Sequence, residues 1–390
     1  PGSRTFARQF TDAGYDTAAC GKLHHGGRDQ MQGWTKRYGE HGPGDVYDVE
    51  APEVRESAVS AGKWLSKKEV KRAGPGRATN RLRDEHAVDG AELFVESHFL
   101  DPFYDRATPD VPAMLKVSLN QPHYPFYVDE ELFEYYLNRV EPFVEEPPDH
   151  RMLRGHWAEG YTVRPGEDAT VREITRATAA YYGMVETVDR SYGRILDRLE
   201  AAGEDLDEWI IVFCSDHGEL LGQHGSWQKS RFYEGSARVP LFVRWPEQFD
   251  GKRIEENVNL ADLYATLCDL AGVSVPDDGA ARDSRSLRPL LAGDTETWHR
   301  RYPDDETVSA YGDSVMIKRG DLKYMWFGDG EKSIASPEVL FDLSTEEGEY
   351  RNRATEAAYE DDVTEFRQRR QELGYGSEAV RAAYESAGYS

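Results

Sequence analysis

The sequence predicts an α/β protein in which a mixed, mainly parallel sheet is flanked by helices and followed by a small antiparallel α+β domain. Three observations predict it. Short apolar runs typical of buried strands each end at a group of polar residues. Long stretches with helical spacing of apolar residues lie between these runs. From about residue 304 onward, closely spaced strand-like segments surround a Gly-Asp turn, which is typical of antiparallel pairing.

The first elements alternate as expected for such a sheet. Thr5–Ala13 has a helical apolar stripe, and Tyr15–Cys20 has the length of a short strand. The segment 31–83 is rich in glycine and charge, which predicts an insertion of loops on the face that carries the site. Glu85–His98 is predicted as a helix and Met114–Leu119 as the next strand.

The central and C-terminal elements continue this pattern. Glu173–Ala202 has the spacing of one long helix. The apolar run Trp209–Cys214 has the β-branched content of a buried strand in a parallel sheet. Ser314–Phe327 is predicted as two strands joined by the Gly-Asp turn. We expect a large α/β domain over residues 1–303 and a small domain with an antiparallel sheet and a terminal helix over 304–390.

The composition limits the classes of partner. The 390 residues include 72 acidic and 47 basic side chains, a formal net charge of -25. Such a surface repels phosphates, so we expect no nucleic-acid partner. The acidic residues are spread along the chain, which predicts a highly hydrated surface adapted to high salt, as in a halophile, rather than an acidic tail. A membrane-spanning helix needs about 20 apolar residues in a row, and no such run occurs. The sequence therefore predicts no membrane span and a soluble protein, and it leaves the compartment open, with the cytoplasm favoured.

Polar groups come directly after three of the predicted strands. Lys22 and His24 follow the first of these strands, His123 follows the second, and Asp216 and His217 follow the third. In open α/β sheets, ligands bind beyond the carboxyl ends of the strands, so we expect these groups to meet. An adjacent carboxylate and imidazole can hold a divalent cation. An aspartate after a strand is also a common helix cap, which is the alternative for the third group.

Several segments resemble one known family. The run S-D-H-G-E-L-L-G-Q-H-G-S-W-Q-K, which ends at Lys229, is followed by F-Y-E-G-S-A-R-V-P-L, and together they resemble the sulfatases of the alkaline phosphatase superfamily. A-G-Y-D-T-A-A-C-G-K-L-H-H at Ala13–His25 resembles the family's lysine-histidine segment. L-N-Q-P-H-Y-P-F at Leu119–Phe126 resembles its histidine-containing substrate loop. The resemblance implies an alkaline-phosphatase-like fold in which residues 1–303 form the catalytic domain.

The resemblance also implies a role for each basic residue of the site. Lys22 and Lys229 would bracket the oxygens of a sulfuryl group as positive charges. His123 would bind one of these oxygens or, with Lys229, protonate the leaving alcohol. His24 would act as the base that releases the sulfated intermediate, with the adjacent His25 as the alternative.

The same resemblance implies a metal-dependent sulfuric ester hydrolase. Asp216 and His217 would bind the divalent metal, for which calcium is implied. Because histidine is a nitrogen ligand, manganese or zinc stays open. The substrate would be a small-molecule or carbohydrate sulfate ester, whose identity the sequence does not give.

The family's nucleophile is a cysteine in C-x-P-x-R or C-x-A-x-R that is converted to formylglycine. Cys20, Cys214 and Cys268 have other contexts. Their odd number and wide spacing predict buried free thiols rather than a disulfide framework or a zinc cluster. We therefore expect the formylglycine, with paired aspartates that supply further metal ligands, upstream of Pro1. The chain by itself is then expected to be an inactive fragment.

Two alternatives to sulfate ester hydrolysis stay open. The first is a phosphomonoester, phosphodiester or phosphonate hydrolase of the same superfamily, since the same scaffold and metal suit tetrahedral phosphorus. The second is an inactive remnant that binds anions. An upstream cysteine in the modification motif would favour the sulfatase, and an upstream threonine or serine would favour phosphoryl transfer. The absence of turnover after the upstream segment is restored would favour the remnant.

Overall fold

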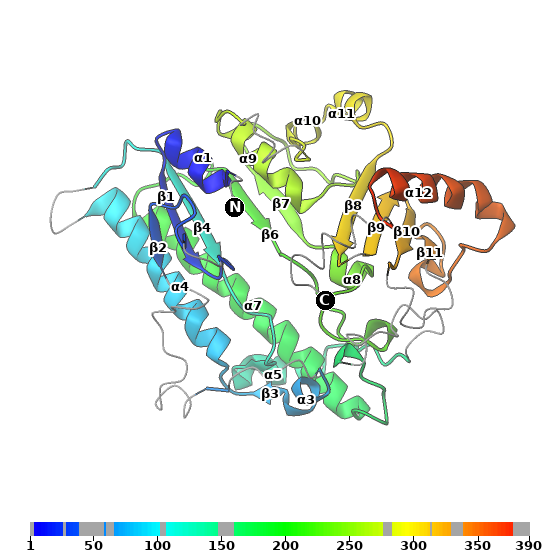
Figure 1. Cartoon of the computed structure of the whole chain (residues 1–390). Helices are drawn as coiled ribbons and strands as arrows, with labels where there is room; N and C mark the ends of the chain where they lie inside the picture. Colours follow the sequence, from blue (N-terminus) through cyan, green and yellow to red (C-terminus); the bar gives the residue numbers. More distant parts are fainter. Residues whose placement is uncertain are drawn as a thin grey trace.

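The structure is a computed structural model that describes residues 4–25, 29–38, 58–59, 66–101, 107–146, 160–275, 283–312, 314–328 and 338–376. A layered α/β body and an antiparallel sheet beside it make up these residues, and Figure 1 shows the two parts next to each other.

A parallel sheet with the order β2-β1-β4 lies at the centre of the α/β body. Its middle strand β1 (Asp16–Gly21) pairs in parallel with β2 (Lys36–Tyr38) and with β4 (Ala113–Ser118). The strands predicted at Tyr15–Cys20 and Met114–Leu119 are therefore confirmed, each shifted by one residue. Because parallel neighbours point the same way, the residues that follow β1 and β4 emerge at one edge of the sheet.

Helices cover both faces of this sheet (Figure 1). On one face, α4 (Thr79–Val95) and α7 (Val171–Ala201) pack together and enclose Cys20 of β1. On the other face lie α1 (Phe6–Asp12) and α9 (Leu263–Leu270). Since successive strand residues point to opposite faces, the run Ala-Ala-Cys in β1 is buried on both sides.

The long helix α7 confirms the helix predicted at Glu173–Ala202. Its start is fixed by a capping box: Thr170 Oγ1 accepts from the N–H of Glu173, whose carboxylate accepts from the N–H of Thr170. Its end is set by Gly203, whose φ of +98° suits glycine far better than any other residue.

The strand predicted from Trp209–Cys214 exists, but its predicted place in a parallel sheet is wrong. β6 (Ile211–Cys214) pairs antiparallel with β7 (Leu241–Arg244). Its first three residues are part-buried and Cys214 is exposed. Among the described strands β6 has no partner on its other edge. It is therefore less buried than its apolar sequence predicted.

The predicted C-terminal antiparallel sheet is confirmed, with the order β11-β10-β9-β8. Four hairpin-connected or neighbouring strands form it: β8 (Glu306–Tyr311), β9 (Ser314–Arg319), β10 (Leu322–Trp326) and β11 (Glu338–Asp342). Across them lies α12 (Glu360–Glu372), whose Phe366 stacks on Tyr324 with ring centres 5.4 Å apart. The boundary between two domains at residue 304 stays a prediction.

The C-terminal sheet packs against the loop that follows β6. Phe232 and Tyr233 of this loop share one apolar cluster with residues of β9, β10 and β11. At the same junction the fully buried Lys323 donates to Glu234 at 2.8 Å and to Glu349 at 3.0 Å. Glu349 also accepts from the N–H of Glu234. The loop is thus held by the sheet through apolar contacts and a buried charge network.

Shorter elements connect these parts. They are α3 (Ser66–Arg72), β3 (Gly74–Pro75), β5 (Tyr127–Val128), α5 (Glu130–Leu137), α8 (Glu234–Ala237), α10 (Arg288–Leu291) and α11 (Thr295–Arg301). The insertion expected over 31–83 lies partly outside the described residues; its described parts include β2, α3 and the start of α4.

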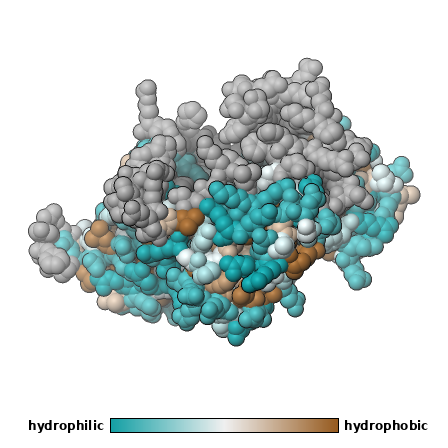
Figure 2. Space-filling model, turned by 90° about the horizontal axis from the view of Figure 1, so that it is seen from below, coloured by the Kyte–Doolittle hydropathy of each residue, from teal (hydrophilic) through white to brown (hydrophobic). Residues whose placement is uncertain are grey.

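The surface agrees with the composition. Figure 2 shows a face on which hydrophilic residues predominate and hydrophobic residues are scattered between them. Every helix in the described part of the chain is too short or too polar to cross a membrane.

Replacing Lys323 by alanine is expected to lower the free energy of unfolding by about 3–5 kcal/mol, because two carboxylates would remain together without their cation. Urea denaturation of the variant and the wild type measures this difference. Arg300→Ala removes an exposed ion pair with Glu296 and is the matched control, with a change below about 1 kcal/mol. Equal losses in both variants would contradict the role of Lys323.

Candidate active site

The ends of β1 and β4 are joined where the predicted site begins. Lys22 follows β1 directly, and its backbone N–H donates to the carbonyl oxygen of Ser118, the last residue of β4, at 2.8 Å. Gly21 has a φ of +83°, and a Cβ at this position would lie 2.2 Å from that oxygen. A glycine is therefore required for the close approach. The loop after β4, which carries His123, starts beside Lys22.

Electrostatic coupling links the groups from the separate strand ends. Partial burial lowers the pKa of His123 and of His217, and the ammonium groups of Lys22 and Lys229 lower both further. The pKa of His24 is lowered in the same way, by partial burial and then by these two lysines. Such coupling requires short distances. The groups from the separate strand ends are therefore near enough to one another to interact electrostatically.

His123 is held in one tautomer. Its Nδ1 lies 2.8 Å from the carbonyl oxygen of Tyr124, which can only accept, so Nδ1 carries the hydrogen and Nε2 carries the lone pair. Burial, with Lys229 and Lys22 adding to it, lowers the pKa of His123 to about 3. An anion bound beside the ring brings the opposite charge and raises this pKa. Near neutral pH His123 is thus neutral in the free protein, and its Nε2 can accept a hydrogen bond.

Two buried polar residues of α4 anchor the loop around His123. Asp84 accepts from the backbone N–H groups of Asn120 and Gln121 at 2.5 and 2.8 Å. One turn earlier, Asn80 donates to the carbonyl oxygens of His123 and of the next residue at 3.2 and 3.0 Å. Residues four positions apart lie on one face of a helix, so α4 holds both parts of the loop. Burial raises the pKa of Asp84 to about 6, and the amide donors oppose this shift.

Glu219 lies in the same loop as Lys229, the loop after β6, and supports it. Glu219 accepts from the N–H of Gln228, the residue before Lys229, and burial raises the pKa of Glu219 to about 7. Partial burial lowers the pKa of Lys229 to about 8, and Glu219 opposes this shift. Lys229 Nζ lies 5.6 Å from the ring centre of Tyr124, within cation–π range. Gln228 and Ser230 have φ angles of 67° and 71°, which are uncommon for residues with a side chain and occur often at functional sites.

Asp216 and His217, the predicted metal ligands, lie next to each other in the loop after β6. His217 Nδ1 lies 2.9 Å from the carbonyl oxygen of Gly218, which keeps the hydrogen on Nδ1 and leaves Nε2 available. This Nε2 lies 3.7 Å from Oδ1 of Asp216. Although partial burial alone would raise the pKa of Asp216, His217 and Lys22 hold it below its ordinary value.

The pair alone does not make a complete coordination site. No group of three or more His, Cys, Asp or Glu side chains in the described ranges could hold a metal ion. Divalent cations in proteins take four or more ligands, so the residues present fit a metal as two of its ligands and not as a full shell.

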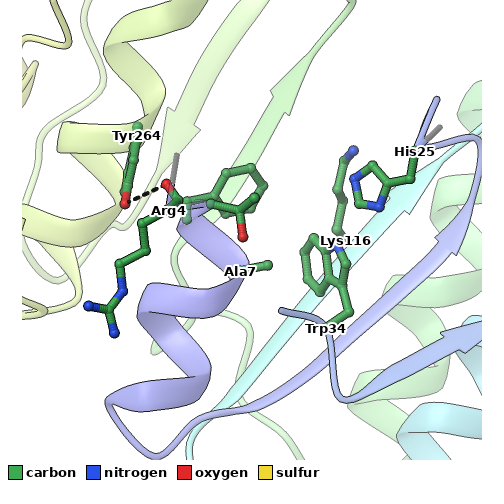
Figure 3. A pocket seen from close by; sticks show the side chains of 8 residues that line it. Arg4, Ala7, His25, Trp34, Lys116 and Tyr264 are labelled. Carbon is green, nitrogen blue, oxygen red and sulfur yellow. Dashed lines mark hydrogen bonds between the residues drawn. The ribbon is translucent and has the colours of Figure 1, made fainter. Parts of the chain in front are cut away.

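The two adjacent histidines have different surroundings. The charged groups of the site shift the pKa of His24, as described above. His25 instead lines a cavity of about 210 Å³, together with Trp34 and Lys116 (Figure 3). Its Nδ1 lies 3.3 Å from the carbonyl oxygen of Gln30. The electrostatic interactions with Lys22, Lys229 and Asp216 favour His24 over His25 as the histidine of the site.

Sequence reasoning missed three charged residues that contribute to the site, namely Asp84, Lys116 and Glu219. Lys116 lies on β4, where burial lowers its pKa and Cys214 and Asp216 oppose the shift. A lysine inside the apolar strand A-M-L-K-V-S was a usable signal for it. Asp84 and Glu219 gave no such signal, because their hydrogen bonds go to loops that only the fold brings close.

Two of the three cysteines are confirmed as buried free thiols. Burial raises the pKa of Cys20 to about 12 and that of Cys268 to about 11, so neither is an activated nucleophile. The expectation is wrong for Cys214, which is exposed because it ends a strand with one unpaired edge among the described residues.

Family models cover most of the chain. The sulfatase family model matches residues 1–273, which is more than half of the chain. The chain belongs to the sulfatase family. A second model, described as the C-terminal part of N-sulphoglucosamine sulphohydrolase, matches residues 222–374. Sulfatases generally use a divalent metal and a formylglycine.

Curated relatives of this sulfatase chain carry sulfatase names. A choline-sulfatase of Rhizobium meliloti is 30% identical over 366 residues, which cover 90% of this chain and 67% of the relative. An arylsulfatase of Clostridium perfringens is 30% identical over 277 residues, which cover 68% of this chain and 54% of the relative. The chain thus spans about half to two thirds of the length of these relatives.

Solved structures with the same fold include a protein bound to a sulfated sugar and a phosphonate monoester hydrolase. A protein in complex with its substrate D-glucosamine-2-N,6-O-disulfate has a TM-score of 0.64 and 19% identity, covering 95% of this chain and 81% of that one. A phosphonate monoester hydrolase of Agrobacterium radiobacter has a TM-score of 0.67 and 20% identity, and the match covers 97% of this chain and 80% of that one. The predicted alkaline-phosphatase-like fold is confirmed, and the predicted class, sulfuric ester hydrolase, is confirmed at the level of the family.

Asp84→Ala is expected to lower the free energy of unfolding by about 2–4 kcal/mol, because two buried backbone N–H groups lose their acceptor. The variant should also bind inorganic sulfate more weakly, since His123 is no longer fixed. Urea denaturation and calorimetry measure the two effects. Asp89→Ala, at an exposed position of the same helix, is the control and should change stability by less than about 0.5 kcal/mol. An unchanged sulfate affinity in Asp84→Ala would contradict the anchoring role.

The affinity for inorganic sulfate is expected to fall as the pH rises through about 8. Lys229 is charged below its pKa of about 8 and loses its charge above it, whereas His24, His123 and His217 all have lowered pKa values and do not titrate in this range. Lys229→Arg should keep the affinity at alkaline pH, because the guanidinium stays charged. Calorimetric titrations at constant ionic strength test this. A wild-type profile that stays flat across pH 8 would contradict the assignment.

Proposed function

We propose that this chain is the catalytic body of a sulfuric ester hydrolase that acts on a small-molecule or carbohydrate sulfate ester. The observation that carries the proposal is the convergence of Lys22, His123 and Lys229 beside the Asp216 and His217 pair. These positively charged residues belong to a chain with a net charge of -25. The local charge of the site is therefore opposite in sign to that of the average surface. A tetrahedral oxyanion is the ligand whose charge and shape the site suits.

The two lysines stabilise the charge of the sulfuryl group. Cleavage at sulfur builds negative charge on the bridging oxygen, while the outer oxygens keep theirs. Lys22 and Lys229 act as fixed positive charges at these oxygens, in a place where partial burial strengthens electrostatic interactions. Lys229, with a pKa of about 8, is charged at neutral pH and can still release a proton.

The two histidines handle protons. His123 would bind a sulfuryl oxygen or, with Lys229, protonate the leaving alcohol, and a bound anion favours the protonated ring that these roles need. His24 is neutral at physiological pH, since its pKa is lowered, and can accept a proton as a general base.

Two groups outside the described side chains complete the chemistry. Asp216 and His217 would hold a divalent cation, which would withdraw charge from the sulfate, and a formylglycine would supply the nucleophile. We favour calcium, as the family resemblance implies, with manganese or zinc as alternatives because of the imidazole ligand. None of the three cysteines stands in a modification motif, so none of them is proposed as the formylglycine.

Hydrolysis of a phosphate or phosphonate ester is the second candidate. Phosphonate monoester hydrolases share the fold at 20% identity. This similarity shows that the fold can carry such an activity, and it does not indicate the substrate of this chain. Curated relatives at 30% identity are named sulfatases, and this favours the sulfate ester.

In the intact protein, Lys229→Ala is expected to lower kcat/KM for an aryl sulfate by about 100-fold or more, because a charge at the sulfuryl oxygens is lost. Turnover of 4-nitrophenyl sulfate, with the phosphate and phosphonate esters of the same phenol in parallel, measures activity and preference. Lys252→Ala, at an exposed lysine, is the matched control and should keep full activity. A preference for the phosphorus esters would replace the proposed function, and near-normal rates in Lys229→Ala would remove Lys229 from the site.

Removal of the metal with a chelator should abolish this turnover, and calcium should restore it better than manganese or zinc. Asp216→Asn should weaken calcium binding measured directly by calorimetry, because the variant loses a charged oxygen ligand. Turnover that persists after complete metal removal would contradict the assignment of Asp216 and His217.

A further inference from the structure

Arg231, two residues after Lys229, has a guanidinium without an anionic partner. Its Nη1 donates to the carbonyl oxygen of Ser230 at 2.8 Å. Its Nε and Nη2 are buried and have no hydrogen-bond acceptor. No carboxylate of the described ranges forms an ion pair with it.

Two other arginines with little exposed surface, Arg285 and Arg353, are paired with acids. Arg285 donates to both carboxylate oxygens of Asp262 at 2.7–3.2 Å, and Arg353 forms ion pairs with Glu347 and Glu356. With 72 acidic residues in the chain, partners are abundant. A buried charge with unsatisfied N–H donors is strongly unfavourable, and in a native protein it indicates a bound group or a functional role.

Tyrosine side chains surround this guanidinium. Arg231 lies over the ring of Tyr161, 5.2 Å from its centre. Burial lowers the pKa of Arg231, and Tyr161, Tyr233 and Tyr311 oppose the shift, so the side chain stays charged. The N–H donors of a guanidinium lie in one plane, and this arrangement suits the oxygens of a carboxylate or a sulfate.

Aromatic rings connect Arg231 with the sulfuryl site. Lys229 lies over the ring of Tyr124, 5.6 Å from its centre. Tyr124 and Tyr161 are close enough for Tyr161 to raise the pKa of Tyr124 in addition to the effect of burial. The side chain of Tyr161 also interacts with that of Ser230, which lies between the two basic residues, and this lowers the pKa of Tyr161. Arg231 therefore flanks the site that holds Lys229 and is separated from it by two rings.

We propose that Arg231 and Tyr161 form a subsite for a second anionic group of the substrate, a carboxylate or a sulfate, next to the sulfate that is hydrolysed. The proposal rests on the proposed function, because it places the hydrolysed sulfate at Lys22 and Lys229. Since Nε and Nη2 are closed to water in the free protein, the anion reaches them when the Arg231 side chain turns toward it. The gain in binding comes from two charge-assisted hydrogen bonds to donors that are unsatisfied without the ligand.

The test uses ligands that cannot be hydrolysed. Alkanes with a sulfonate at both ends, in a series of spacer lengths, are compared by calorimetry with the matching monosulfonates on the intact protein at constant ionic strength. At the best spacer length the disulfonate is expected to bind at least about 10-fold more tightly than its monosulfonate. A parallel series with one sulfonate and one carboxylate shows which second anion is preferred.

Arg231→Gln should reduce the affinity ratio of disulfonate to monosulfonate to about one. Arg231→Lys should give an intermediate ratio, because lysine keeps the positive charge but lacks the planar set of N–H donors of the guanidinium. Arg253→Gln, at a highly exposed arginine, is the matched control and should keep the wild-type ratio. Thermal unfolding of each variant verifies that it is folded. A ratio near one in the wild type, no binding of any disulfonate, or a ratio that Arg231→Gln leaves unchanged would overturn the subsite. A protein that binds disulfonates through Arg231 and yet hydrolyses no sulfate ester would refute the proposed function alone.

Discussion

The site depends on several positive charges that the fold holds together. Lys22, Lys229 and Lys116 come from distant parts of the chain, and each interacts electrostatically with Asp216. Like charges repel more strongly where water is excluded, and partial burial already lowers the pKa values of Lys116 and Lys229. A tetrahedral anion relieves this repulsion. Because the average surface of the chain is acidic, the attraction for anions must come from these positions and not from the net charge.

The fold keeps these charges in place by separate means. The close pairing of β1 and β4 at Gly21 fixes Lys22, and the buried face of α4 holds the His123 loop through Asp84. Glu219 fixes the backbone before Lys229, and the C-terminal sheet holds the rest of that loop. Each of these interactions is a hydrogen bond or contact between segments far apart in sequence. The geometry of the site therefore depends on the whole α/β body and its neighbouring sheet.

Much of the fold and the main site residues could be predicted from the sequence, because strands that end at polar residues leave a local signal. The strands before Lys22 and His123 follow this pattern, and the electrostatic coupling of both residues agrees with a common site. The pairing of β6 could not be predicted, because nothing in Ile211–Cys214 encodes which strand lies beside it or in which direction. Asp84 and Arg231 could not be predicted either, since an isolated charged residue looks like a surface residue until its buried surroundings are known.

The central claim is that Lys22, His123 and Lys229 together bind one tetrahedral oxyanion. Selenate has the shape and charge of sulfate, and its selenium can be located by anomalous diffraction in crystals of the intact protein. The account predicts a selenium peak between the three side chains, with oxygens within hydrogen-bond distance, about 2.7–3.2 Å, of the two ammonium groups. A peak elsewhere on the protein, with these three side chains pointing away from one another, would contradict it.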